Sequence, residues 1–220
     1  MYFIVLRHFF AFIFSLLFSL YLIPGIIKTA LKFNIVDFPD GKLKTHKKPT
    51  PYLGGVAIFI SFILTLTLTY PLENNVLWIV LGMSILLFIG LIDDFNVLKP
   101  HQKFLGQFIV VIGFLKNGFS LKTTFFSDWF NIFISGFWML SVINAINLID
   151  VMDGLATTIA IMSCITFLII AFVLQQYLIS LFLITMLGVL IGFFYYNKPT
   201  AKIYLGDAGS LLIGGFLAAT

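Results

Sequence analysis

The sequence has little charge and a single cysteine. Only 10% of its 220 residues are charged, against roughly 25% in typical soluble domains. Its one cysteine, Cys164, lies inside an apolar run, so neither a disulfide framework nor a zinc-type cysteine cluster is available. The three histidines, His8, His46 and His101, are scattered rather than grouped. The scarcity of charge excludes an ordinary soluble domain.

Long apolar runs recur along the whole chain. Segments near 20 apolar residues have the length that an α-helix needs to cross a bilayer, whereas a core helix of a soluble protein is usually shorter and amphipathic. The sequence therefore predicts an all-α fold, a polytopic membrane helix bundle in one domain with about eight transmembrane helices. We place the spans at 9–27, 52–70, 76–92, 104–121, 129–149, 155–174 and 177–196, with an eighth beginning near Ser210.

Basic residues divide unequally between the two sides of the predicted membrane. If the spans alternate in direction, ten of the thirteen Lys and Arg residues fall on one side, and only Arg7, Lys116 and Lys122 fall on the other. Cytoplasmic loops carry the excess of Lys and Arg. We therefore expect a multi-pass protein of the cell (inner) membrane. Its cytoplasmic loops then lie near 28–51, 93–103, 150–154 and 197–209.

Carboxylates gather on this same predicted face. Carboxylates close together either shift one another's pKa or share a hard divalent cation, and lysines beside them suit phosphate groups. Such a set fits a magnesium ion that bridges a nucleotide diphosphate. Because no Gly-rich Walker motif is present, a P-loop enzyme is excluded. The five carboxylates are Asp93, Asp94, Asp150, Asp153 and Asp207.

Each polar motif also has a structural interpretation when it is taken alone. Asp93-Asp94 is compatible with a helix end that enters water, and Asn side chains join membrane helices through hydrogen bonds. Asp153 and Asp207 are suitable N-caps for the helices that follow them. The functional interpretation therefore depends on the motifs meeting at one face.

Four motifs occur in an order that resembles a known family. The sequence resembles the polyprenyl-phosphate N-acetylhexosamine-1-phosphate transferases of glycosyltransferase family 4. This family includes the enzymes that start lipid-linked assembly of peptidoglycan, lipopolysaccharide O-antigen and teichoic acid linkage units. The motifs are Lys48-Pro-Thr-Pro-Tyr-Leu-Gly-Gly-Val-Ala57, Asp93-Asp94, Asn144 to Ala156 and Leu205-Gly-Asp-Ala-Gly-Ser210, spread over nearly the whole chain.

The resemblance implies an enzyme of the first membrane step of cell-wall or surface polysaccharide synthesis. Such an enzyme transfers a sugar-1-phosphate from a UDP-N-acetylhexosamine to undecaprenyl phosphate or another polyprenyl phosphate, and it releases UMP. Family members require Mg²⁺, with Mn²⁺ as an alternative. The resemblance also implies an integral membrane protein with its active site facing the cytoplasm, a homodimer by family analogy, and no nucleic-acid partner.

The resemblance also assigns roles to individual residues. Asp207 matches the magnesium-binding aspartate of the family. Asp93 matches the residue that deprotonates or orients the acceptor phosphate, with Asp94 in support, and Asp150 and Lys103 complete the predicted catalytic set. Tyr204 matches an aromatic residue that stacks on uracil. The predicted substrate-binding residues are Lys48, Asn144, Asn147, Asp153, Asn197 and Tyr204.

Two features depart from the family pattern. Where the family usually reads Asp-Gly-Leu-Asp-Gly, this chain has Asp150-Val-Met-Asp-Gly154, so a β-branched Val151 replaces a glycine beside the uridine. The chain also stops at Thr220, about ten residues into an apolar run that needs about 20 to span. Family members continue through several more helices and a histidine-rich loop. We therefore expect the C-terminal part of the fold to be missing.

Two other classes of function remain open. A truncated or inactive family member that binds lipid or a partner protein would account for Val151 and for the short chain. A cation-coupled transporter would place ionisable groups near the bilayer midplane on broken helices. The clustering of the acids at one face favours the transferase over the transporter.

Overall fold

The computed structural model describes residues 2–38, 49–71, 74–95 and 97–220. Within these ranges the protein is mostly helical. A short antiparallel strand pair, β1 (Val36–Asp37) and β2 (Thr50–Pro51), is an addition to the all-α prediction. The helices are α1 (Tyr2–Lys32), α2 (Gly54–Thr69), α3 (Asn74–Asp94), α4 (Pro100–Lys116), α5 (Asp128–Ile149), α6 (Leu155–Val173), α7 (Tyr177–Asn197) and α8 (Gly206–Ala219).

Five of the described helices are long and apolar enough to cross a membrane: α1, α3, α5, α6 and α7. The protein is therefore a multi-pass membrane protein. The other three helices are shorter, with 16 residues in α2, 17 in α4 and 14 in α8. The predicted count of about eight spans is thus not confirmed, although eight helices stand close to the predicted positions.

Several predicted boundaries differ from those observed: α1 begins at Tyr2 rather than at residue 9, and α4 covers Pro100–Lys116 rather than 104–121. Helix α1 continues through Lys28 to Lys32, so the predicted loop 28–51 begins later. Helix α8 begins at Gly206 rather than near Ser210, because the backbone N–H groups of Asp207 and Ala208 already find a carboxylate acceptor in Asp94.

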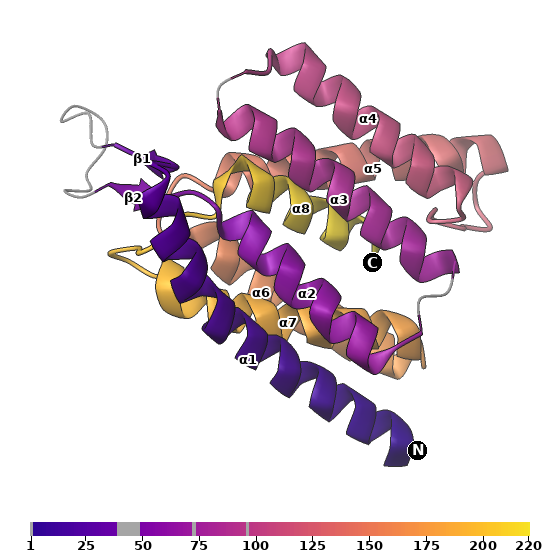
Figure 1. The fold of residues 1–220 in the computed structure, drawn as a ribbon. Helices are drawn as coiled ribbons and strands as arrows, with labels where there is room; N and C mark the ends of the chain where they lie inside the picture. The colour runs from indigo at the N-terminus through magenta and orange to yellow at the C-terminus, as the bar shows by residue number, and fades with distance from the viewer. Residues whose placement is uncertain (1, 39–48, 72–73, 96) are drawn as a thin grey trace.

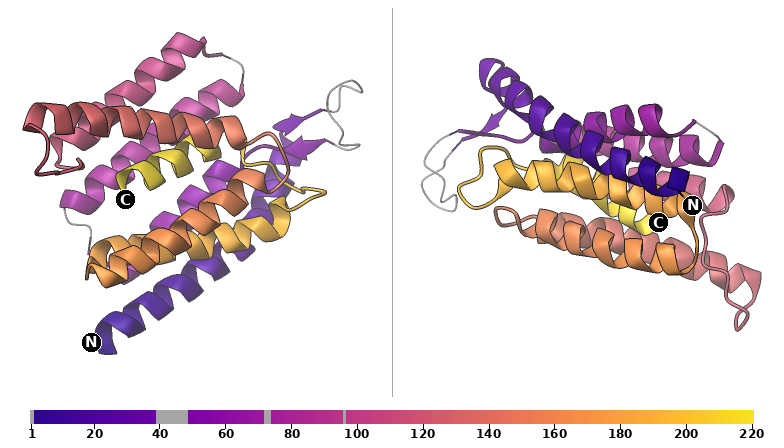
Figure 2. Two further views of the ribbon diagram at one scale, coloured as in Figure 1. Left: turned by 180° about the vertical axis from the view of Figure 1, so that it is seen from behind. Right: turned by 90° about the horizontal axis from the view of Figure 1, so that it is seen from below.

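Helix α8 lies in the interior of the bundle. It runs between α3 and α5, as two opposite views show (Figures 1 and 2). Every residue from Ala208 to Ala218 is buried. Because other helices surround α8, its apolar side chains pack against protein. Helix α7 packs on α1 and α6 and forms the second buried layer.

The helices alternate in direction, so the ends of α1, α3, α5 and α7 lie at one end of the bundle. The strand pair lies at this end, and the N-terminus lies at the opposite end (Figures 1 and 2). The starts of α2, α4, α6 and α8 share the end that carries the strand pair. The polar motifs near residues 93, 150 and 207, far apart in the sequence, are therefore brought together.

Candidate active site

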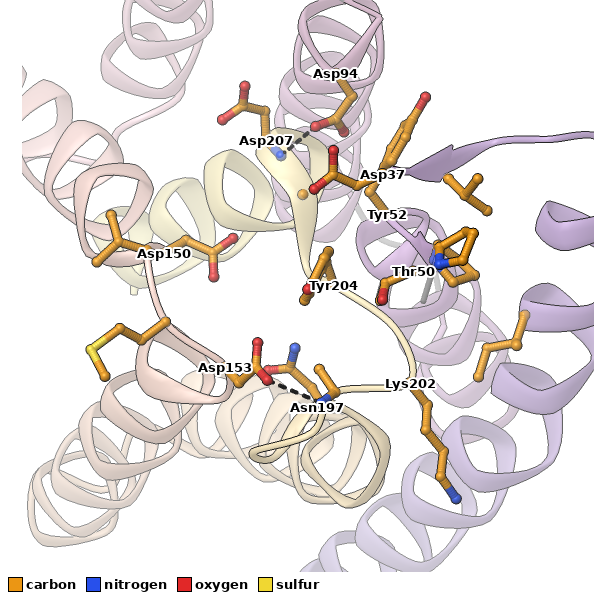
Figure 3. A pocket seen from close by; sticks show the side chains of 18 of the residues that line it. Asp37, Thr50, Tyr52, Asp94, Asp150, Asp153, Asn197, Lys202, Tyr204 and Asp207 are labelled. Carbon is orange, nitrogen blue, oxygen red and sulfur yellow. Dashed lines mark hydrogen bonds between the residues drawn. The ribbon is translucent and has the colours of Figure 1, made fainter. Parts of the chain in front are cut away.

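A cleft of about 1690 Å³ opens at the end of the bundle that carries the strand pair. Its walls come from the ends of α1, α3, α5 and α7, from the strand pair and from the segment that leads into α8 (Figure 3). Most of the predicted site residues line it, whereas Lys103 and Asn144 lie behind its wall and Lys48 falls outside the described residues. The predicted residues that line the cleft are Asp93, Asp94, Asn147, Asp150, Asp153, Asn197, Tyr204 and Asp207.

The ammonium group of Lys103 joins four helices. Its Nζ lies 2.6 Å from Oδ2 of Asp93 on α3 and 3.3 Å from Oδ1 of Asp207 on α8. It also donates a hydrogen bond of 3.0 Å to Oδ1 of Asn147 on α5. Lys103 stands in the first turn of α4, which begins at Pro100 and is supported by the Gln102 side chain accepting the Lys99 N–H. The start of α4 thus directs Lys103 towards the acids.

Asn147 completes the cluster with both ends of its amide. While Oδ1 accepts from Lys103, Nδ2 donates to Oδ1 of Asp207 and, at 2.8 Å, to Oγ of Ser210. The carboxylates of Asp93 and Asp207 lie close together, since each of them contacts Nζ of Lys103. Two carboxylates this close repel each other unless a cation or a proton lies between them, and Lys103 provides the cation.

Asp94 faces a different partner from Asp93. Its Oδ1 accepts the backbone N–H of Asp207 at 2.8 Å, and its Oδ2 accepts that of Ala208 at 3.2 Å (Figure 3). These N–H groups open α8, where a negative charge also complements the helix dipole. Gly206 has φ of 73°, and a Cβ there would lie 2.9 Å from the Asp94 carboxylate. Asp94 therefore caps α8 and fixes Asp207.

Small residues let other backbone segments approach the start of α8. Gly54 and Gly55 donate backbone hydrogen bonds of 3.1 Å to the carbonyls of Tyr204 and Leu205. A Cβ on Gly55 would run into the backbone of Gly209, and one on Gly90 of α3 would run into Ala208. The backbone that carries Asp207 is therefore held from two sides.

Asp153 and Asn197 organise the segment between α7 and α8. Oδ2 of Asp153 accepts the N–H of Ala201 at 3.0 Å. Asn197 is 3% exposed, accepts a hydrogen bond from Thr157 and donates one to the carbonyl of Ile203. Both side chains are thus bound to protein in this structure. They shape the wall on which Tyr204 stands.

Asp150 and the two residues after it lie along the cleft. Burial, followed by the nearby carboxylates of Asp207 and Asp153, raises the pKa of Asp150 to about 7. Val151, at the position of the family glycine, is 76% exposed and Met152 is 67% exposed. The β-branched side chain is therefore accommodated without burial, and the two residues add apolar surface to the cleft.

The cleft also contains polar residues that the sequence analysis did not select. Thr50 and Tyr52 belong to the same motif as Lys48, and Lys202 precedes Tyr204 by two residues, so motif proximity could have identified them. Asp37 lies outside every motif, so nothing in the sequence indicated that it belongs to the site. Burial, with the charges of Asp94 and Asp37, raises the pKa of Tyr52, so its phenol keeps its proton. The four residues are Asp37, Thr50, Tyr52 and Lys202.

Asp93 and Asp207 provide carboxylate oxygens, which are suitable ligands for a magnesium ion. In the described part of the chain, no group of three or more His, Cys, Asp or Glu side chains is arranged to hold a metal. Mg²⁺ commonly binds through only one or two carboxylates, with waters and substrate phosphates as its other ligands. The presence of the Lys103 ammonium between these carboxylates indicates a position built for positive charge.

Comparisons with known proteins agree with this geometry. Residues 76–220 match the family model described as glycosyl transferase family 4. The chain is 34% identical to a probable undecaprenyl-phosphate N-acetylglucosaminyl 1-phosphate transferase of Bacillus subtilis, with 93% of the chain covering 59% of that protein. It is 33% identical to a phospho-N-acetylmuramoyl-pentapeptide-transferase of Streptococcus pneumoniae, with 90% of the chain covering 67% of the relative. The chain therefore spans only part of these proteins.

The different partners of Asp93 and Asp94 predict different effects on stability. Asp94→Ala removes two acceptors from the start of α8 and is expected to lower the free energy of unfolding by about 2 kcal/mol. Asp93→Ala is expected to have a smaller effect. Lys103 keeps its contacts with Asn147 and Asp207 in this variant, and the repulsion between the carboxylates of Asp93 and Asp207 is relieved. Thermal unfolding of both variants in one detergent measures the difference. Equal losses would contradict the assignment of Asp94 as the cap.

The raised pKa of Asp150 predicts a pH-dependent stability. An acid whose pKa is higher in the folded protein favours folding below its unfolded-state pKa of about 4 and loses that contribution as the pH rises to about 7. Asp150→Asn is therefore expected to raise the melting temperature at pH 8, by a few degrees, and to have little effect near pH 4. Melting curves recorded with a chelator present test this.

The matched control is Asp128→Asn, which removes an exposed carboxylate at the other end of α5. No gain that increases with pH is expected for this variant. A gain for Asp150→Asn that stays constant between pH 4 and pH 8 would show that Asp150 does not titrate as described.

Proposed function

The chain belongs to glycosyl transferase family 4, and from this premise we propose that it transfers an N-acetylhexosamine-1-phosphate from a UDP-sugar to a membrane polyprenyl phosphate. The acceptor we propose is undecaprenyl phosphate, and the second product is UMP. The observation that carries the proposal is the contact of Lys103 with Asp93, Asn147 and Asp207 behind a cleft at the helix ends. That position suits a reaction between a lipid phosphate and a water-soluble nucleotide.

The proposed reaction is a single in-line displacement. An oxygen of the acceptor phosphate forms a bond to the β-phosphorus, and the bond from that phosphorus to the oxygen of UMP breaks. Because charge spreads over both phosphates, catalysis of this kind is mainly positioning and electrostatic neutralisation. A lipid phosphate is largely ionised near neutral pH, so the protein needs no strong base. Asp93 then serves to orient the acceptor.

The charged cluster supplies the neutralisation in this proposal. Lys103 offers its ammonium group to a phosphate oxygen while it keeps the two carboxylates together. Asp207, with Asp93, would hold Mg²⁺, for which Mn²⁺ is an alternative. When it is bound, the metal supplies Lewis-acid stabilisation of the departing UMP phosphate. Asn147 keeps Asp207 in one orientation through its amide hydrogen bond.

The nucleotide would occupy the side of the cleft opposite α3. We assign the uracil to Tyr204 and the ribose region to the edge near Asp150, with Asp153 and Asn197 supporting the wall behind them. The excess of lysine near this end supports a cytoplasmic cleft, where UDP-sugars are available. Lys48 remains a proposed phosphate-binding residue on sequence grounds alone, and the homodimer likewise remains a proposal from family analogy.

Transfer of label tests the proposed function directly. Membranes that contain the full-length product of this reading frame are supplied with undecaprenyl phosphate, Mg²⁺ and UDP-N-acetylglucosamine labelled in the sugar. Lipid-soluble label is expected, and it should disappear with a chelator. Asp207→Asn is expected to reduce the rate by at least about 100-fold, the scale of losing a key electrostatic group. The exposed Asp128→Asn should transfer label at the wild-type rate.

Two outcomes count against the proposal. If the folded protein transfers no label from any UDP-N-acetylhexosamine, the inactive lipid-binding alternative gains support. If Asp207→Asn transfers label as fast as the wild type, the cluster around Lys103 is not the reaction centre. Testing several UDP-amino sugars in parallel also identifies the donor.

A further inference from the structure

A second polar contact joins α4 and α5 one helical turn away from Lys103. Nδ2 of Asn144 donates a hydrogen bond of 2.7 Å to Oε1 of Gln107 and a second, of 2.8 Å, to the carbonyl of Leu140. Gln107 follows Lys103 by four residues and Asn144 precedes Asn147 by three, so each pair shares one face of its helix. Neither Gln107 nor Asn144 lines the cleft.

This contact is placed where α4 has few directional restraints. One face of α4 is exposed, with Leu105 57% and Ile109 64% accessible, while Val110, Val111 and Phe114 pack into the bundle. Apolar packing between membrane helices tolerates small rotations and shifts, whereas a side-chain hydrogen bond between helices specifies one alignment. The bond from Asn144 to Gln107 therefore fixes the position of α4 relative to α5.

The burial of Gln107 has an energetic cost. Its side chain is fully buried, and its Nε2 finds no acceptor in the described part of the chain. An unsatisfied buried amide destabilises the fold, and a leucine of similar size would avoid that loss. Because Nδ2 of Asn144 also donates to the Leu140 carbonyl, turning over the Gln107 amide alone would set two NH₂ groups against each other. In exchange for this cost, the polar side chain of Gln107 aligns α4 with α5.

We propose that Gln107 and Asn144 are positioning residues that align α4 on α5 so that Nζ of Lys103 reaches Asp93, Asn147 and Asp207. The inference rests on the proposed function, because it assigns these residues a purpose through the reaction centre. They act on Lys103 and touch no substrate. Loss of their hydrogen bond would leave the fold in place and displace the ammonium group.

The first test compares kcat with KM in the full-length protein. Gln107→Leu keeps the buried volume and removes the hydrogen bond. A misplacement of about 1 Å can reduce a rate by about 100-fold, so kcat is expected to fall between about 10-fold and 100-fold. KM for the UDP-sugar should change by less than kcat, because Lys103 is only one of the proposed contacts to the donor and the proposed nucleotide wall is untouched.

An exchange of the two side chains tests the hydrogen bond itself. Gln107→Asn shortens one partner and Asn144→Gln lengthens the other, so each single variant is expected to lose activity as Gln107→Leu does. The double exchange keeps the combined length and should return kcat to within about 3-fold of the wild type, which is the non-additivity expected of contacting residues.

A packing control and a readout independent of activity complete the design. Val111→Ala removes buried apolar contact one turn further along α4; it should lower the melting temperature while kcat stays unchanged well below that temperature. Acetylation of Lys103, followed by mass spectrometry, reports how well its ammonium group is held. Gln107→Leu should accelerate this acetylation several-fold, and Val111→Ala should not.

The outcomes separate the inference from the proposed function. An inactive wild-type protein would refute the proposed function, and the acetylation rates would still decide whether Gln107 positions Lys103. An active wild type with unchanged kcat and unchanged Lys103 acetylation in Gln107→Leu would overturn the inference alone. Parallel losses of kcat in Gln107→Leu and Val111→Ala would also overturn it, since the contact would then be only structural.

Discussion

The arrangement of this protein depends on one ammonium group placed among carboxylates at the boundary of a membrane bundle. Carboxylates in such a place are costly unless a cation and hydrogen bonds compensate them. Lys103 provides that compensation for Asp93 and Asp207, and Asn147 provides the remaining hydrogen bonds. Since the four residues come from four helices, the position of each helix bears on the same contact.

The start of α8 is the most constrained part of this arrangement. Gly55 and Gly90 allow two other backbones to approach it, and Asp94 accepts its first free N–H groups. The adjacent aspartates at the end of α3 therefore divide their tasks. Asp94 secures the backbone that carries Asp207, and Asp93 shares the Lys103 ammonium with Asp207. A change at Asp94 would reach the reaction centre through the backbone.

Much of this arrangement could be predicted from the sequence, for identifiable reasons. Apolar runs located the helices, and alternation of direction placed Asp93, Asn147 and Asp207 at one end. The cap formed by Asp94 and the cleft position of Asp37 could not be predicted, because both depend on contacts between residues distant in the sequence. Composition also did not distinguish a helix that is buried among other helices, such as α8, from one that faces lipid. The catalytic and binding roles of the site residues remain predictions.

A structure of the full-length protein with a UDP-N-acetylhexosamine and Mg²⁺ would test the central claim most directly. We expect the diphosphate between the Lys103 ammonium and the Asp207 carboxylate, the metal on Asp207 and Asp93, and the uracil against Tyr204. A diphosphate bound away from Lys103, with no metal beside Asp93 and Asp207, would contradict this claim.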